Sequence, residues 1–268
     1  MSQDAYFTDA SMLRRVLREY VVAFSGPRAL LMMAAHPVAF EGFFMSTGAL
    51  DDPYERLRRT AVVMDEIVWG SRRKADRMTA HVRKMHAGAR GTLPADAGAF
   101  PAGTVWAADS PELLLWIVAC LMDSASLAYD RYVARMTRDE RDALWQDYKV
   151  VGACFGLRAQ DMPDTVEDFD AYMAAMLAGD TLWVTDRARE LGRRIVFNPP
   201  LPMAARPLVE VVNQITVGLL PRKLRKGFRL RWDPVRDLAV TANAEYVKRA
   251  VVPFLPDRLR YVPGARAA

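Results

Sequence analysis

Two segments of this chain are apolar around the whole circumference of a helix, and they constrain its fold more than any other feature. The first covers residues 30–40 within a predicted helix from 28 to 45, and the second covers residues 113–122. A helix without a polar face has to be buried on all sides. Two such helices therefore predict a multilayer helical core, with interior apolar space of the kind that a hydrophobic ligand or a flat macrocycle needs.

The remaining segments are amphipathic, and their boundaries can be read from the residue types. Apolar residues recur with the helical period between residues 9 and 24. Thr137 and Glu140 form a capping-box pattern, and Pro111 stands in the first turn of another helix. We find no segment with convincing strand alternation and no internal repeat. The sequence predicts an all-α protein of about ten helices, a single domain over residues 1–268.

Charge and composition exclude several classes of function. The net charge is +5 with a pI near 9.3, but the basic residues are spread over many segments and are not interleaved with aromatic side chains. We therefore expect no nucleic-acid binding. The N-terminus lacks the pattern of a secretion signal, and the longest uncharged apolar run, residues 113–122, is shorter than the roughly 20 residues that span a bilayer. We expect a cytoplasmic location.

Most motifs for catalysis or metal binding are absent from the sequence. It has no glycine-rich phosphate loop, no zinc-binding pattern, no nucleophile elbow and no paired Glu-x-x-His motif. Its three histidines, His36, His81 and His86, are left as the candidates for chemistry. His36 precedes Pro37, which is expected to kink its helix; a pocket role and a hydrogen-bonded core role both stay open for it.

A charged helical hairpin follows the first apolar segment and carries the strongest candidate site. Arg56, Arg59 and Thr60 occupy positions i, i+3 and i+4 of one helix and therefore share a face. The next helix carries His81 and His86. This set suits an anionic cofactor held by a histidine, and it also fits a purely structural hairpin. The two histidines lie at similar angles to the apolar stripe, so periodicity does not choose between them.

Five motifs in a fixed order resemble a known family. The chain is similar to the MpaB/rubber-oxygenase (latex-clearing protein) family over roughly residues 10–256, and residues 257–268 form a tail. The motifs are Leu-Leu-Met-Met-Ala-Ala before His36-Pro37, Asp-Pro-Tyr-Glu-Arg-Leu-Arg-Arg-Thr ending at Thr60, Val-Arg-Lys-Met-His-Ala-Gly-Ala-Arg-Gly ending at Gly91, Asp-Ser-Pro-Glu-Leu-Leu-Leu-Trp ending at Trp116, and Gly-Leu-Leu-Pro-Arg-Lys-Leu-Arg ending at Arg225.

The resemblance implies an all-helical fold with a globin-like core around a pocket for haem b. It implies that His86 is the iron ligand, and that Arg56, Arg59 and Thr60 are catalytic residues near the distal side of the haem. The implied reaction uses O2 on a small hydrophobic substrate, as in the oxidative cleavage of a C=C bond of an isoprenoid, or a related oxidation. The residues expected to contact the cofactor are His86, Arg56, Arg59, His36 and Arg90.

Two positions depart from the family pattern. The rubber oxygenases carry a lysine where this chain has Arg59, and that lysine can close the distal iron position. Arginine stays protonated and does not ligate, so we expect an open or water-bound distal site here. Many relatives have a histidine where this chain has Val118. The missing export signal favours a small intracellular substrate over an extracellular polymer.

Two other hypotheses remain beside the oxygenase. The first is a non-catalytic carrier or sensor that binds haem or lipid. The second is a peripheral membrane contact through residues 221–232, where six Lys and Arg stand beside Phe228 and Trp232.

Overall fold

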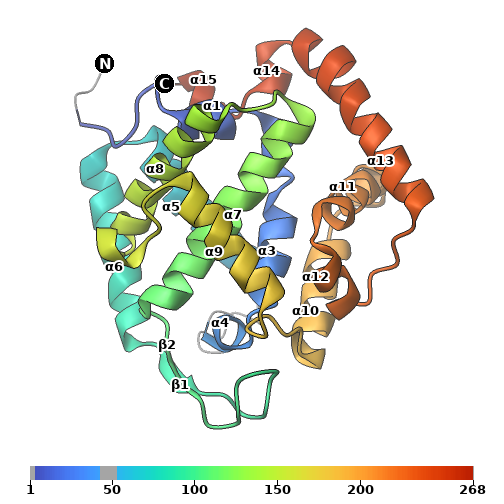
Figure 1. Cartoon of the computed structure of the whole chain (residues 1–268). Coiled ribbons are helices and arrows are strands. Elements are labelled where there is room, and N and C mark those ends of the chain that lie inside the picture. The colour runs from blue at the N-terminus through green and yellow to red at the C-terminus, as the bar shows by residue number, and fades with distance from the viewer. Residues whose placement is uncertain (1–3, 43–52, 268) are drawn as a thin grey trace.

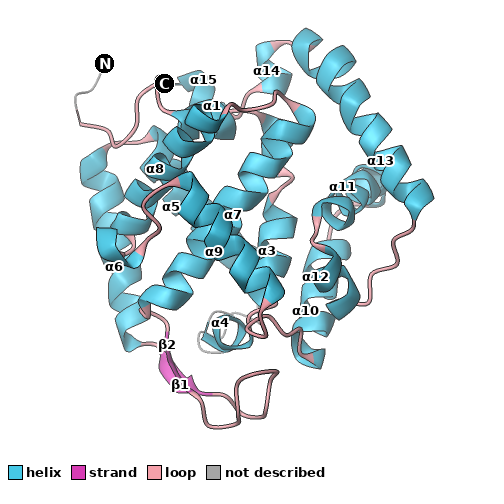
Figure 2. Cartoon of the chain, in the orientation of Figure 1, coloured by secondary structure: helices cyan, strands magenta, loops and turns pink. Residues whose placement is uncertain are grey.

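Helices dominate the fold of this protein. The computed structural model describes residues 4–42 and 53–267. Within these residues, two short strands pair to form one small sheet, and the other named elements are helices (Figure 2). The predicted all-α class is therefore confirmed. Most buried apolar side chains belong to one cluster that extends from Phe7 to Phe228.

The centre of this core is α7 (Pro111–Tyr132), the second of the two apolar segments. It packs against α3 (Gly26–Ala34) on one side and α8 (Arg138–Cys154) on another. Trp116, among other side chains, is fully buried within it. Among the described residues, α7 is the one helix whose length and composition would allow it to cross a membrane, but most of that stretch is buried inside the bundle. This burial is what the absence of a polar face predicts.

The first apolar segment forms two helices where we predicted one kinked helix. α3 ends at Ala34, and α4 (Pro37–Phe40) begins after His36. His36 has φ −91° and ψ 111°, an extended conformation of the kind that a following proline favours. The chain thus breaks fully at this point, and the predicted residues 43–45 lie outside the described part of the chain.

The charged hairpin predicted between the two apolar segments is present. It consists of α5 (Pro53–Trp69) and α6 (Arg72–Gly88), which contact each other along their lengths and are joined by a short turn at Gly70 and Ser71. The Ser71 hydroxyl accepts a hydrogen bond from the Lys74 amide and caps α6. α6 also contacts α8, which attaches the hairpin to the core.

A small β-hairpin follows α6, although no segment of the sequence shows convincing strand alternation. β1 (Arg90–Thr92) pairs antiparallel with β2 (Val105–Ala107), and Gly91 lies opposite Trp106. The prediction that the chain has no strands is wrong here. Strands of three residues are too short to show an alternating pattern, so hydrophobic periodicity cannot indicate them.

The other helices surround α7, and one predicted helix is interrupted. The helix predicted over residues 9–24 is divided at Glu19. The α-helical hydrogen bonding of the last long helix ends at Tyr246, but the chain continues as a π-helical turn (Val247–Val251) and a 3-10 turn (Val252–Phe254), so the helical path ends beside Pro253, where we expect the last helix to stop. The remaining helices are α1 (Met12–Leu17), α2 (Tyr20–Ala23), α9 (Val166–Ala178), α10 (Asp186–Phe197), α11 (Arg206–Leu219), α12 (Arg222–Gly227), α13 (Pro234–Tyr246), α14 (Asp257–Arg260) and α15 (Pro263–Ala267).

A buried ion pair connects the N-terminal helices to the C-terminal part of the chain. The Glu19 side chain is 2% exposed, and its carboxylate accepts hydrogen bonds of 2.9 Å from both Nε and Nη2 of Arg260. The amide of Val262 donates to the carbonyl oxygen of Arg18 at 2.8 Å beside it. These contacts hold α14 against the break between α1 and α2.

We predict that Arg260→Ala destabilises the protein by about 3 kcal/mol, because it leaves the Glu19 carboxylate buried without its main partner. Urea unfolding followed by circular dichroism measures this. Arg249→Ala is the matched control, since the pair of Arg249 with Glu245 is exposed on both sides and its loss should change little. Equal effects of the two variants would contradict the structural role of the Glu19–Arg260 pair.

Candidate functional site

The predicted site residues gather at one end of the helical bundle. α5 and α6 are antiparallel; Arg56 lies 13 residues before the end of α5 at Trp69, and His86 lies 14 residues after the start of α6 at Arg72. Arg56 and His86 are therefore at nearly equal distances from the turn that joins their helices. Figure 1 shows α4 and the β-hairpin at the same end, beside the lower ends of α6 and α7.

His86 is a partly buried imidazole whose Nδ1 lacks a hydrogen bond. This nitrogen is buried and has no partner among the residues that the structure describes. Burial lowers the pKa of His86 below its usual value, the charge of Arg56 lowers it further, and Asp109 opposes the shift. The imidazole is therefore neutral at pH 7, which is the form that binds metal ions.

Arg56 is the cation whose charge lowers the pKa of His86. Its side chain is partly buried, and burial lowers the pKa of Arg56 to about 10. The guanidinium is still protonated at neutral pH. A partly buried positive charge beside a neutral imidazole is suited to an anionic group, because burial reduces the competition from water.

Arg59 and Thr60 lie on the solvent side of the same helix. The Arg59 side chain is 75% exposed, and its Nε donates to Glu55 Oε1 at 2.9 Å. The Thr60 hydroxyl donates to the carbonyl oxygen of Arg56 at 3.1 Å. The structure thus brings Arg56 and His86 to the same end of the hairpin, while Arg59 and Thr60 bond within their own helix.

Arg90 contacts an acidic residue that sequence reasoning did not include in the site. Its Nη2 lies 3.1 Å from Asp109 Oδ2, which connects β1 to the residues just before α7. Asp109 also acts on His86, whose pKa it raises. The one available signal for Asp109 was its place in the helix-start motif before Pro111, which indicated a structural role.

His36 has the features of a core residue. It is 7% exposed, and its ring stacks on Phe100 with 5.4 Å between ring centroids and 29° between ring planes. Its Nδ1 accepts a hydrogen bond of 3.4 Å from the Ala39 amide and so caps α4. Burial lowers the pKa of His36 to about 4. These contacts favour the hydrogen-bonded core role. The third histidine, His81, is exposed on α6.

Trp106 is a second residue at this end of the bundle that sequence reasoning missed. It is 7% exposed, and its Nε1 is buried without a hydrogen-bond partner in the described part of the chain. Its ring packs on two glycines: a Cβ on Gly91 would lie 2.6 Å from Cζ2, and a Cβ on Gly42 would lie 3.4 Å from Cε3. Glycine at position 91 is therefore required for the ring to reach the β-hairpin backbone.

The donor set at this end fits a cofactor that takes one protein ligand. Residues 4–42 and 53–267 contain no group of three or more His, Cys, Asp and Glu side chains that could hold a bare metal ion. They do contain one neutral histidine with an unpaired buried nitrogen, beside a partly buried arginine. A neutral imidazole is one of the side chains that bind haem iron, and cations pair with haem propionates, so His86 and Arg56 fit this group.

An all-helical bundle with a partly buried, neutral histidine is a fold that can enclose a prosthetic group for oxidative chemistry. Residues 13–260 match the family described as "ER-bound oxygenase mpaB/B'/Rubber oxygenase, catalytic domain". The chain belongs to this oxygenase family, which confirms the resemblance found in the sequence. Neither the curated proteins nor the solved structures contain a match to the chain.

We predict that the stability of the protein falls as the pH drops from about 6.5 to about 4, through His36. The folded state holds this histidine neutral with a pKa of about 4, whereas the unfolded chain takes up the proton at about 6.5. The loss due to His36 amounts to about 3 kcal/mol at the acid end. Urea unfolding across this pH range measures it. The His36→Gln variant should lose this part of the pH dependence and His81→Gln should keep it; equal pH profiles for wild type and His36→Gln would contradict the assignment.

We also predict that Gly91→Ala destabilises the protein by about 1–3 kcal/mol, because the new methyl group displaces the Trp106 ring. Gly88→Ala is the control: nothing lies within 4 Å of a Cβ at position 88, and alanine favours the helix there. Tryptophan fluorescence during urea unfolding reports both changes. If Gly91→Ala is as stable as Gly88→Ala, the packing of Trp106 on the hairpin is not a constraint.

Proposed function

We propose that this protein is a haem b-dependent oxygenase that uses O2 on a small hydrophobic substrate such as an isoprenoid. The observation that carries the proposal is the partly buried His86, held neutral and with an unpaired Nδ1, at the same end of the α5–α6 hairpin as Arg56. Membership of an oxygenase family supports the reaction type. The cytoplasmic location stays a prediction.

His86 would bind the iron, and Arg56 would pair with a carboxylate of the cofactor. Burial makes both roles more favourable, because it keeps the imidazole neutral and weakens the hydration of the guanidinium. When bound, the haem supplies the iron chemistry that directs O2 to a C=C bond. The two apolar segments, α3 with α4 and α7, offer the hydrophobic surroundings that such a substrate needs.

Arg59 and Val118, the two positions that differ from the family pattern, would supply no iron ligand on the distal side of the haem. Arg59 cannot ligate iron, and its guanidinium is held by Glu55. Val118 is 3% exposed within α7 and has no ligating atom. We therefore propose a distal site that is open or occupied by water.

A second candidate function is a carrier or sensor that binds haem or lipid without catalysis. One observation favours it: Arg59 and Thr60, two of the three predicted catalytic residues, bond to their own helix and lie exposed. If these side chains stay in solvent when the cofactor binds, only Arg56 remains to act near the substrate.

We predict that the purified protein has a Soret band that shifts after dithionite and carbon monoxide, and that His86→Ala reduces haem affinity at least about 100-fold because the axial ligand is lost. His81→Ala is the matched control, since His81 lies exposed on the same helix. Titration of the apo-protein with hemin, followed by absorbance, measures the affinity.

Two outcomes separate the candidates. Normal haem binding by His86→Ala would remove His86 as the ligand. Haem binding without O2 consumption across a panel of terpenoids would favour the carrier or sensor over the oxygenase.

A further inference from the structure

Positive charge is concentrated in one part of the chain, residues 193–231. This stretch carries nine Lys and Arg against a single acid, Glu210, a net charge of +8, whereas the whole chain carries +5. The rest of the protein is therefore net negative. The stretch covers the end of α10, the connector after it, α11, α12 and the residues before α13.

Most of these cations face solvent, and the structure shows no carboxylate paired with them in the described part of the chain. None of the exposed ones makes an ion pair with a carboxylate within residues 4–42 and 53–267. The exposed cations are Arg193, Arg194, Arg206, Arg222, Lys226, Arg229 and Arg231.

The segment predicted from the sequence to contact a membrane, residues 221–232, contributes charge but little apolar surface. Phe228 is fully buried, and Arg225 lies over the Trp232 ring with 5.5 Å to its centroid. The Lys223 ammonium donates to the carbonyl oxygen of Gly179. The apolar part of any such surface must come from elsewhere.

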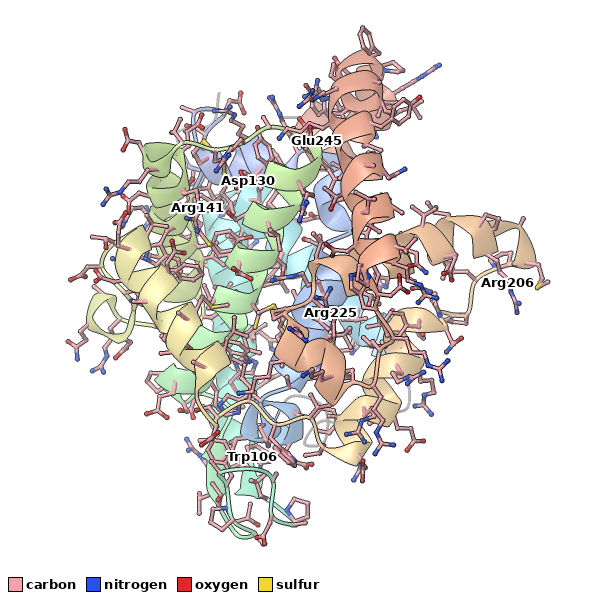
Figure 3. The ribbon with its side chains drawn as sticks, turned by 45° about the vertical axis from the view of Figure 1, so that its right-hand side comes forward. Trp106, Asp130, Arg141, Arg206, Arg225 and Glu245 are labelled. Atoms are coloured by element: carbon pink, nitrogen blue, oxygen red, sulfur yellow. The ribbon has the colours of Figure 1, made fainter. Side chains whose placement is uncertain are left out.

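Exposed aliphatic side chains occur in the same stretch, around the start of α11. Leu201, Met203, Leu208 and Val211 are 55%, 71%, 57% and 51% exposed. The buried side chains of α11 all belong to its second half, from Ile215 onward. Figure 3 shows α11 extending away from the body of the molecule, with Arg206 at its outer end. The first half of α11 therefore has no fully buried side chain and exposes Leu208 and Val211.

We propose that these seven cations and four aliphatic side chains form a docking surface for an anionic phospholipid membrane. Exposed aliphatic side chains enter the interface between headgroups and acyl chains, and the cations around them bind the anionic headgroups. Single-stranded nucleic acid fits less well, because stacking on bases needs aromatic side chains and the four exposed apolar residues are aliphatic. A second copy of the chain would bring two surfaces of the same charge together.

The docking surface adjoins the candidate active site. The Tyr54 hydroxyl donates to the carbonyl oxygen of Ile195 at 3.1 Å, and the charge of Arg194 acts on Tyr54. Tyr54 and Arg56 share the first turn of α5. A hydrophobic substrate dissolved in a bilayer would thus be close to the site; this consequence rests on the proposed function, whereas membrane binding itself does not.

Sedimentation with vesicles tests the proposal on the whole 268-residue chain. We expect binding to vesicles of phosphatidylcholine with about 30% phosphatidylserine, little binding to phosphatidylcholine alone, and release when the salt is raised from about 0.1 M to about 0.5 M. Arg206→Glu/Lys226→Glu should weaken binding at least about tenfold. Its control, Arg73→Glu/Arg77→Glu, makes the same change in net charge on exposed positions of α6.

A second pair of variants tests the apolar part. Met203→Ser/Leu208→Ser should also weaken vesicle binding at least about tenfold, while Val105→Ser/Val150→Ser, which removes exposed apolar groups elsewhere, should not. Far-UV circular dichroism checks that each variant is folded. The proposal is overturned by absence of vesicle binding, by equal loss in the charge control, or by a short single-stranded RNA that displaces the protein from vesicles. None of these outcomes depends on haem, so failure here leaves the haem titration unaffected.

Discussion

Burial of α7 is the constraint on which the rest of the structure depends. Its apolar surface extends around the whole helix, so α3, α8 and α2 must cover it from several directions. The residues just before α7 are thereby fixed at one end of the bundle, where Asp109 reaches Arg90 of the β-hairpin. The candidate site is assembled at this end because the two helices of the α5–α6 hairpin are antiparallel. His86, near the end of α6, therefore lies at the same end of the hairpin as Arg56, near the start of α5. The site is thus a consequence of how the core is closed.

The sequence predicted the elements whose signal is local. The capping box of Thr137 and Glu140 is present with both of its hydrogen bonds, and the apolar run at residues 113–122 is the centre of α7. It did not predict the complete break at His36, because a proline in an apolar run is compatible with a kink or with two helices. The choice between them depends on tertiary contacts, here the stacking of the His36 ring on Phe100, 64 residues away in the chain.

In the candidate site, too, local sequence patterns predicted some features, while others depend on tertiary contacts. Spacing alone placed Arg56, Arg59 and Thr60 on one helix, and it left His81 and His86 equivalent. Exposure distinguishes them: His86 and Arg56 are partly buried, while Arg59, Thr60 and His81 face solvent. Exposure depends on which neighbouring helices cover each side of the hairpin, which no local pattern encodes. Trp106 was missed for a related reason, since its packing on Gly91 arises from strand pairing between short segments.

The charges around His86 act together in favour of a bound anionic cofactor. Arg56 disfavours the protonated imidazole, so it keeps the lone pair of one ring nitrogen available for a metal ion. The same guanidinium attracts a carboxylate, and its partial burial strengthens that attraction. Asp109 opposes both effects, but its carboxylate is engaged by Arg90, which reduces the negative charge that His86 experiences. Arg56 would therefore have two roles: it keeps the His86 imidazole neutral, and it attracts a carboxylate of the cofactor. Partial burial removes part of the hydration of the Arg56 guanidinium, and an anion bound at this end of the bundle would offset that cost.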